Sequence, residues 1–111
     1  MDYQAAGKDD VAALARVPDA DLNRANENGT TLLMVAARRG NLESVRALLK
    51  RGADPRARDH DGQTVLHYAL PSKNRALISE LLRAGADPHV TDRFGVTPAE
   101  DDIVLDLLQA K

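Results

Sequence analysis

The side chains that could carry chemistry in this sequence are its three histidines and the adjacent aspartates Asp101 and Asp102. His60, His67 and His89 show no His-x3-His spacing, and the chain has no cysteine, so their pattern does not indicate a zinc site. Asp101 and Asp102 could serve as a pair of catalytic acids. Because adjacent residues of a helix point in different directions, we interpret them instead as the cap and the N-terminal charge of a last helix.

The serines and glycines give no signature of a nucleophile or a nucleotide site. Ser44, Ser72 and Ser79 lie in no nucleophile elbow and have no base nearby in the sequence. The glycines do not form a G-x-G-x-x-G run or a phosphate-binding loop. We therefore predict that the chain is not an enzyme and binds neither a cofactor nor a metal ion.

The composition predicts one small helical domain. The chain has 111 residues, of which 43% are hydrophobic but only 3% aromatic, so its core must be built from Leu, Val, Ile and Ala. No apolar run approaches the roughly 18 residues that a membrane span needs, and no signal peptide is visible. A formal net charge of −2 argues against nucleic-acid binding. Together with the absence of cysteine, these features predict a cytoplasmic protein that binds neither membrane nor nucleic acid.

A period of 33 residues runs through most of the sequence. Three sets of residues recur at this spacing: Gly29, Gly62 and Gly95; Thr31, Thr64 and Thr97; Asn26, Asp59 and Asp92. The run Gly52-Ala53-Asp54-Pro55 recurs in the same way as Gly85-Ala86-Asp87-Pro88. Coincidences at so many positions indicate a repeated structural unit.

Within one period, the residues predict a turn followed by two short helices. Residues 59–62 end in glycine, which suits a turn because it permits positive φ. Thr64 can cap a first helix over 65–70 through its hydroxyl. Residues 76–82 place their large apolar side chains on one stripe of a second helix, which Gly85 then ends.

These residues resemble the ankyrin repeat family. The run Gly62-Gln63-Thr64-Val65-Leu66-His67-Tyr68-Ala69 is similar to the ankyrin pattern G-x-T-P-L-H-x-A, with Val65 in place of proline. The helix end Leu81-Leu82-Arg83-Ala84-Gly85-Ala86-Asp87 also looks like ankyrin. The resemblance implies an all-α solenoid of stacked helix-loop-helix units joined by short hairpin-like loops. It also implies that His67 bridges backbone groups of neighbouring repeats.

The resemblance predicts a single domain of four units. These are a degenerate N-terminal cap (1–25), two full repeats (26–58 and 59–91) and a truncated C-terminal cap (92–111). In the N-terminal cap we expect residues 5–7 to end a short first helix and residues 11–15 to lie in the second. Because a terminal repeat has a neighbour on one side only, the C-terminal cap could leave Val104 and Leu107 exposed.

The resemblance also implies a partner-binding surface, because turn tips and first helices line the concave face of an ankyrin stack. Carried over residue by residue, its contact positions are Glu27, Asn28, Thr30, Arg38 and Arg39 in the first full repeat, His60, Asp61, Gln63, Pro71 and Ser72 in the second, and Arg93, Phe94 and Val96 in the C-terminal cap. Arg38 and Arg39 could pair with carboxylates of a partner or could be solvated surface arginines. Phe94 could anchor an interface or cover the end of the stack.

The leading hypothesis is a non-catalytic protein-protein interaction module: an adaptor, an inhibitor or an antitoxin-like binder of another protein. The alternative is a structural or self-associating scaffold unit, or a fragment of a longer or designed ankyrin array. We expect a monomer, with weak self-association left open.

Overall fold

The computed structural model describes Ala6, Lys8 and residues 11–109, and every regular element in that part of the chain is helical. The α-helices are α2 (Val11–Leu14), α3 (Leu32–Arg38), α4 (Leu42–Lys50), α5 (Val65–Ala69), α6 (Arg75–Arg83) and α7 (Asp102–Gln109). Single 3-10 turns cover Asp19–Asp21, Leu70–Ser72 and Pro98–Glu100. The all-α prediction is therefore confirmed, whereas the helix predicted to end at residues 5–7 falls largely outside the described residues.

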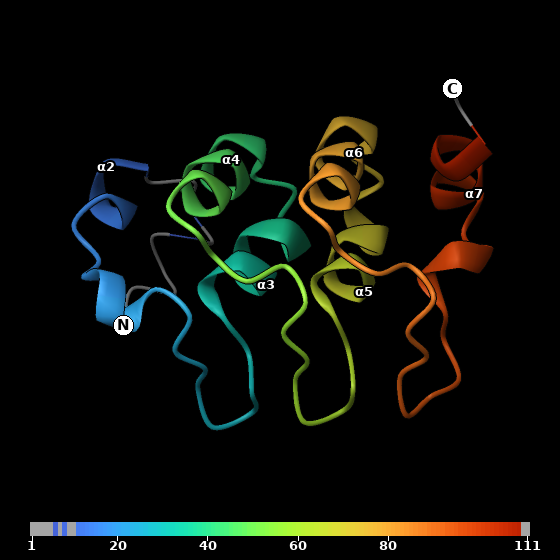
Figure 1. The fold of residues 1–111 in the computed structure, drawn as a ribbon, viewed down its shortest axis with the longest axis horizontal. Coiled ribbons are helices and arrows are strands. Elements are labelled where there is room, and N and C mark those ends of the chain that lie inside the picture. The colour runs from blue at the N-terminus through green and yellow to red at the C-terminus, as the bar shows by residue number, and fades with distance from the viewer. Residues whose placement is uncertain (1–5, 7, 9–10, 110–111) are drawn as a thin grey trace.

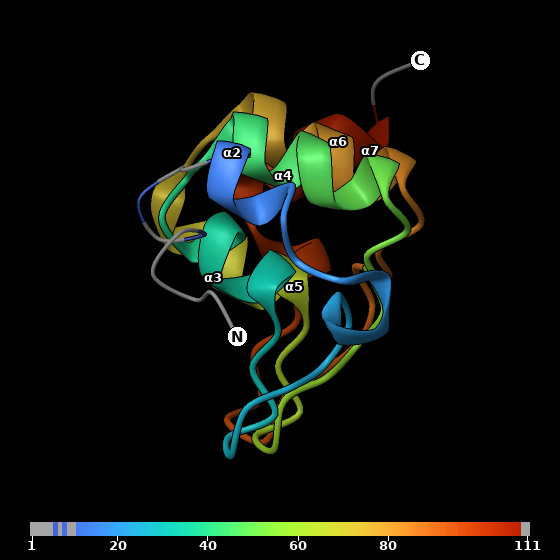
Figure 2. The same cartoon turned by 90° about the vertical axis from the view of Figure 1, so that its left-hand side faces the viewer.

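The helices stack in two rows. Figures 1 and 2 show α3 and α5 side by side in one row, with α2, α4, α6 and α7 in the other. Hairpin-like loops extend from the row of α3 and α5, all in the same direction (Figure 1). We call these loops the first tip (26–30), the second tip (59–63) and the third tip (92–96). In each one, the residue that opens the loop donates its N–H to the carbonyl of the residue that closes it.

Thr31 and Thr64 begin the two first helices. The hydroxyl of Thr31 accepts a hydrogen bond from the N–H of Met34 at 3.3 Å. The N–H of Thr64 is bound by the ring of His67, whose Nδ1 lies 2.9 Å away. Because these caps occupy donors that a helix start would otherwise leave unpaired, they fix the direction in which each helix leaves its tip.

Both first helices are buried between neighbours. Leu66 and Ala69 of α5 and Ala36 and Ala37 of α3 are each fully buried where the two helices pack together. The small alanine side chains let the helices approach closely, and each large aliphatic side chain that is buried contributes roughly 1.5–3 kcal/mol. With only five residues in α5, this burial rather than intrinsic helix propensity must stabilise it.

The N-terminal unit is attached to the stack by Arg51, which follows α4. Its guanidinium donates to the carbonyl of Leu14 at 3.0 Å and pairs with the Asp19 carboxylate at 2.7 Å. A third bond reaches the carbonyl of Val17. The glycine that ends the later second helices has no counterpart here, and Arg51 instead satisfies the carbonyls at the end of α2.

The C-terminal unit is shortened in its first helix. At the position that α3 and α5 occupy in the earlier repeats, the last unit has only the 3-10 turn Pro98–Glu100. Helix α7 begins soon after this turn and packs against α6. Asp101 caps α7, because its Oδ1 accepts from the N–H of Ile103 at 2.9 Å and lies 3.4 Å from that of Val104. The sequence interpretation of this aspartate is thus confirmed.

The prediction that the C-terminal cap exposes Val104 and Leu107 was wrong for Val104. Val104 is fully buried and Leu107 is half-buried against the core. Since α7 begins as early as Asp102, its helical phase turns Val104 inward and leaves Leu105 and Leu108 on the outer side, 40% and 43% exposed.

The first tip lies very close to the second at Gly29. Its φ of +80° is one that L side chains rarely adopt, and a Cβ there would lie 2.9 Å from both the Cα of Asp59 and the backbone N of His60. Gly95 has a similar φ of +82°, but a Cβ there would meet nothing within 4 Å. Both positions therefore require a positive φ, but only at Gly29 is there no space for a Cβ.

We expect Gly29→Ala to destabilise the protein more than Gly95→Ala. Positive φ costs an alanine roughly 1–2 kcal/mol at either position. Only at Gly29 does overpacking against the next tip add about 1–3 kcal/mol, because backbone atoms cannot rotate out of the way. Urea unfolding of both variants measures the difference, and equal losses of stability would contradict the close approach of the tips.

Candidate functional site

Each tip is organised by one side chain at its first residue. Oδ1 of Asn26 accepts from the backbone N–H groups of Asn28 and Thr30 at 2.9 and 3.0 Å. Asp59 and Asp92 do the same for the groups two and four residues on, at 2.8 to 2.9 Å. The Asn amide and the Asp carboxylates therefore stabilise the tips in the same way, because one oxygen of each accepts hydrogen bonds from two backbone N–H groups.

The tips are also bonded to each other. The N–H of His60 in the second tip donates to the carbonyl of Asn28 in the first at 2.9 Å. In the same way, the N–H of Arg93 in the third tip donates to the carbonyl of Asp61 in the second, also at 2.9 Å. The three tips therefore form one hydrogen-bonded strip along the edge of the stack, which holds their side chains at a fixed spacing.

Behind the tips, His67 links the second repeat to the third tip. Because its Nδ1 accepts from Thr64, the ring proton lies on Nε2, which donates to the carbonyl of Val96 at 2.8 Å. The bridging role implied by the ankyrin resemblance is what the structure shows. His67 is buried and fully occupied in this bridge, so the ring is not free to act on a ligand.

The buried carboxylate of Asp92 lies next to this bridge, with its Oδ2 3.9 Å from Nε2 of His67. Burial favours the neutral acid, but the N–H groups of Val96 and Phe94 and the amide of Gln63 outweigh it, and the pKa of Asp92 is held below its ordinary value. The ionised form is therefore the one that the third tip stabilises.

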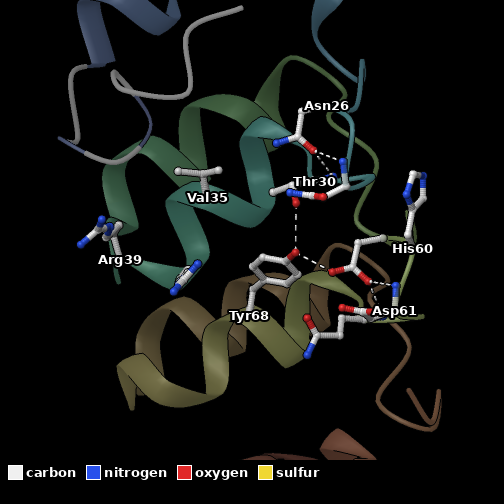
Figure 3. A pocket seen from close by; sticks show the side chains of 11 residues that line it. Asn26, Thr30, Val35, Arg39, His60, Asp61 and Tyr68 are labelled. Atoms are coloured by element: carbon white, nitrogen blue, oxygen red, sulfur yellow. Dashed lines mark hydrogen bonds between the residues drawn. The ribbon is translucent and has the colours of Figure 1, made fainter. Parts of the chain in front are cut away.

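Tyr68 connects two tips from the row of first helices. Its hydroxyl donates to Oδ2 of Asp59 at 2.6 Å and lies 3.1 Å from the hydroxyl of Thr30 (Figure 3). Burial and the adjacent Asp59 carboxylate both raise the pKa of Tyr68, so the phenol stays protonated and keeps its donor role. The ring then forms part of the concave surface beside the tips.

A concave hollow of about 540 Å³ lies between the first two tips and the helices behind them. Figure 3 shows Arg39 at one end of it, the tip residues Asn26, His60 and Asp61 at the other, and Tyr68 between them. Its lining residues are Asn26, Asn28, Thr30, Val35, Arg38, Arg39, Asp59, His60, Asp61, Gln63 and Tyr68. A second hollow of about 280 Å³ adjoins it, lined by Arg38, Gln63, His67, Tyr68 and Pro71.

The structure brings most of the predicted contact residues together. Those that line the first hollow are Asn28, Thr30, Arg38, Arg39, His60, Asp61 and Gln63, and Pro71 lines the second. Glu27 is exposed on the first tip but lines neither hollow. Ser72 is used locally instead, since its hydroxyl donates to the carbonyl of Ala69 at 2.6 Å and accepts from the N–H of Asn74 at 3.2 Å.

The predicted contact residues of the C-terminal cap form a separate group on the third tip. The guanidinium of Arg93 pairs with the Asp61 carboxylate at 3.0 Å and lies 5.6 Å from the ring centroid of Phe94. Phe94 and Val96 are 66% and 44% exposed. The Phe94 ring is therefore open to solvent at the tip rather than packed over the end of the stack.

Sequence reasoning missed four residues that line the first hollow. Val35 and Tyr68 occupy equivalent positions of α3 and α5, and Asn26 and Asp59 equivalent positions at the start of two tips. The repeat spacing identified the last two as turn residues only. The signal for Val35 and Tyr68 was their place on the face of each helix opposite the buried residues, which a helical period reveals.

No group of three or more His, Cys, Asp or Glu side chains that could hold a metal ion occurs among the described residues. Over the same part of the chain, no helix has the length and apolar character required to cross a membrane.

Comparison with known families identifies the repeat. A family model of ankyrin repeats in three copies matches residues 3–92. The chain belongs to the ankyrin repeat family. A comparison with curated proteins gave no match. Ankyrin repeats are generally protein-protein interaction modules and are typically non-catalytic.

We expect Asp92→Asn to alter the acid stability of this ankyrin stack without removing the third tip. Asn26 shows that an amide oxygen can hold the two tip N–H groups. A lowered folded-state pKa contributes stability that is present above the unfolded value of about 3.9 and is lost as pH falls through the folded value. Wild type should therefore exceed the variant in unfolding free energy at neutral pH, and the gap should narrow below about pH 4.

The measurement is urea unfolding of both proteins from pH 7 down through the acid range where the unfolded carboxylate titrates, about pH 4. Because the two proteins share every other carboxylate, the difference between them reports the Asp92 carboxylate together with its interaction with the neighbouring His67 ring. A gap that stays constant through the acid range would contradict the lowered pKa.

Proposed function

We propose that this chain is a non-catalytic binding module that holds another protein on the concave face formed by its tips and first helices, and that it acts as an adaptor, an inhibitor or an antitoxin-like binder. The observation that carries the proposal is the first hollow. It lies across two repeats, and exposed polar side chains from both of them line it.

The surface is suited to binding because the backbone and side chains that shape it are held by hydrogen bonds within the protein. The tip backbone is bonded within each tip and across tips, and Tyr68 is held by Asp59 and Thr30. A partner therefore meets positioned groups and does not have to order them, which lowers the entropic cost of association. The exposed side chains of Asn28, His60, Arg38 and Arg39 remain available at the surface.

A second candidate function is self-association at the C-terminal end. Among the described residues, the large hydrophobic side chains that are exposed all lie in the last unit: Phe94, Val96, Leu105 and Leu108. Exposed apolar surface gathered at one end of a repeat stack could be covered by a second copy. We favour the first candidate because the hollow also supplies directional polar groups, and we propose a monomer that works in the cytoplasm.

The test is a pull-down from native lysate with tagged wild type, Asn28→Trp and Ala84→Trp. Asn28 lines the first hollow, whereas Ala84 is exposed at the end of α6, in the other row of helices. We expect a protein held by wild type and by Ala84→Trp, but reduced about tenfold or more by the indole at position 28, which is the loss that 1.4 kcal/mol produces.

Three outcomes bear on the proposal. Loss of the captured protein with Asn28→Trp alone supports the concave face. Equal capture by both variants would move the interface away from the hollow and contradict the proposed site. A parallel pull-down, with untagged chain added to the lysate, tests the second candidate. Recovery of the untagged chain and of no other protein would favour self-association.

A further inference from the structure

The acidic side chains that line the first hollow have partners within the described part of the protein, whereas the basic ones do not. Its two carboxylates are both engaged within the protein: Asp59 binds two backbone N–H groups with one oxygen and the Tyr68 hydroxyl with the other. Asp61 pairs with Arg93 of the third tip at 3.0 Å. The negative charge of the hollow is therefore already balanced or hydrogen-bonded.

The two guanidiniums of the hollow have no such partners. Arg38 and Arg39 are both exposed, and the side chain of neither forms an ion pair or a hydrogen bond with a described residue. Several other arginines of the stack do form ion pairs, namely Arg24, Arg46, Arg51, Arg75 and Arg93. Two open cations thus line the hollow, and Figure 3 shows one of them, Arg39, at the end opposite the tip residues.

We propose that the first hollow binds an extended acidic segment of a partner protein, with Asp or Glu carboxylates of that segment held by Arg38 and Arg39. The proposal rests on the concave-face function given above and names the chemistry of its partner. Guanidinium groups bind carboxylates through paired, charge-assisted hydrogen bonds, which are stronger than neutral ones. The exposed side chains of Asn28 and His60, at the other end, can meet the polar backbone of the same segment.

A protein segment fits this site better than a membrane or a nucleic acid. The cations lie in a recess between tips and helices, where a flat lipid surface could not reach both them and the floor. Val35 and the ring of Tyr68 offer apolar contact beside the charges, as peptide side chains require. A nucleic acid would also be repelled by Glu27 on the first tip and by the net charge of −2 on the chain.

The test measures binding of a fluorescein-labelled peptide of alternating Glu and Ser by anisotropy at low ionic strength, with a Gln-Ser peptide of equal length as the neutral control. We expect wild type to bind the Glu peptide and not the Gln peptide. Arg38→Ala/Arg39→Ala should weaken binding roughly tenfold or more, since two charge-assisted contacts are lost. Added salt should weaken binding to wild type as well.

The matched control is Arg56→Ala/Arg83→Ala. Both arginines are exposed, neither forms an ion pair with a described residue, and neither lines the hollow, yet the change in net charge is the same. We expect this control to weaken binding by no more than about twofold, the effect of a distant exposed charge. Arg38→Lys/Arg39→Lys keeps both charges but not the paired geometry, and should bind between wild type and the double alanine variant.

Equal weakening by both double alanine variants would overturn the proposal in favour of non-specific charge attraction. No binding of the Glu peptide would also overturn it, while a hollow-dependent partner in the pull-down would leave the concave-face function standing. Stronger, Arg38- and Arg39-dependent binding to phosphatidylserine vesicles than to the Glu peptide would assign the site to a membrane instead. Unchanged urea unfolding midpoints for the variants confirm that folding is not the cause.

Discussion

The stack depends on one constraint: none of its short helices can bury its apolar side chains without a neighbour. Helices of five and seven residues, such as α5 and α3, are too short to persist alone in water. Leu66 and Leu81 reach full burial only because adjacent units cover them. The terminal units have a neighbour on one side only. Arg51 holds the N-terminal unit to the stack by hydrogen bonds and an ion pair, and α7 packs against α6 at the other end.

The same constraint positions the surface. Once α3 and α5 are packed side by side, their tips are brought within hydrogen-bonding distance, and the carbonyl of Asn28 meets the N–H of His60. Glycine at position 29 is needed because no Cβ fits between the two tips. The first hollow lies where two units meet, so its geometry belongs to the interface between repeats and not to either repeat alone.

Repeats made much of this predictable from the sequence. Residues recurring every 33 positions indicated the unit and its turns, and Asp101 was recognised as a helix cap. The bridging role of His67 was implied by the resemblance to ankyrin repeats. The sequence could not show that the first helix of the last unit shrinks to a 3-10 turn, which fixes the phase that buries Val104. Nor could it show that Asp59 is occupied by Tyr68 while Arg38 and Arg39 stay open, because such pairings depend on distances between repeats.

The hydrogen bonds between tips join them into one strip, and native-state amide hydrogen exchange measures whether those bonds persist in solution. His60 and Arg93 donate across tips, whereas the N–H of Glu27, at the equivalent position of the first tip, has no acceptor among the described residues. We expect the amides of His60 and Arg93 to exchange more slowly than that of Glu27 by at least about tenfold, after correction for intrinsic rates. Exchange of all three at the same rate would contradict this expectation, because the tips would then move independently.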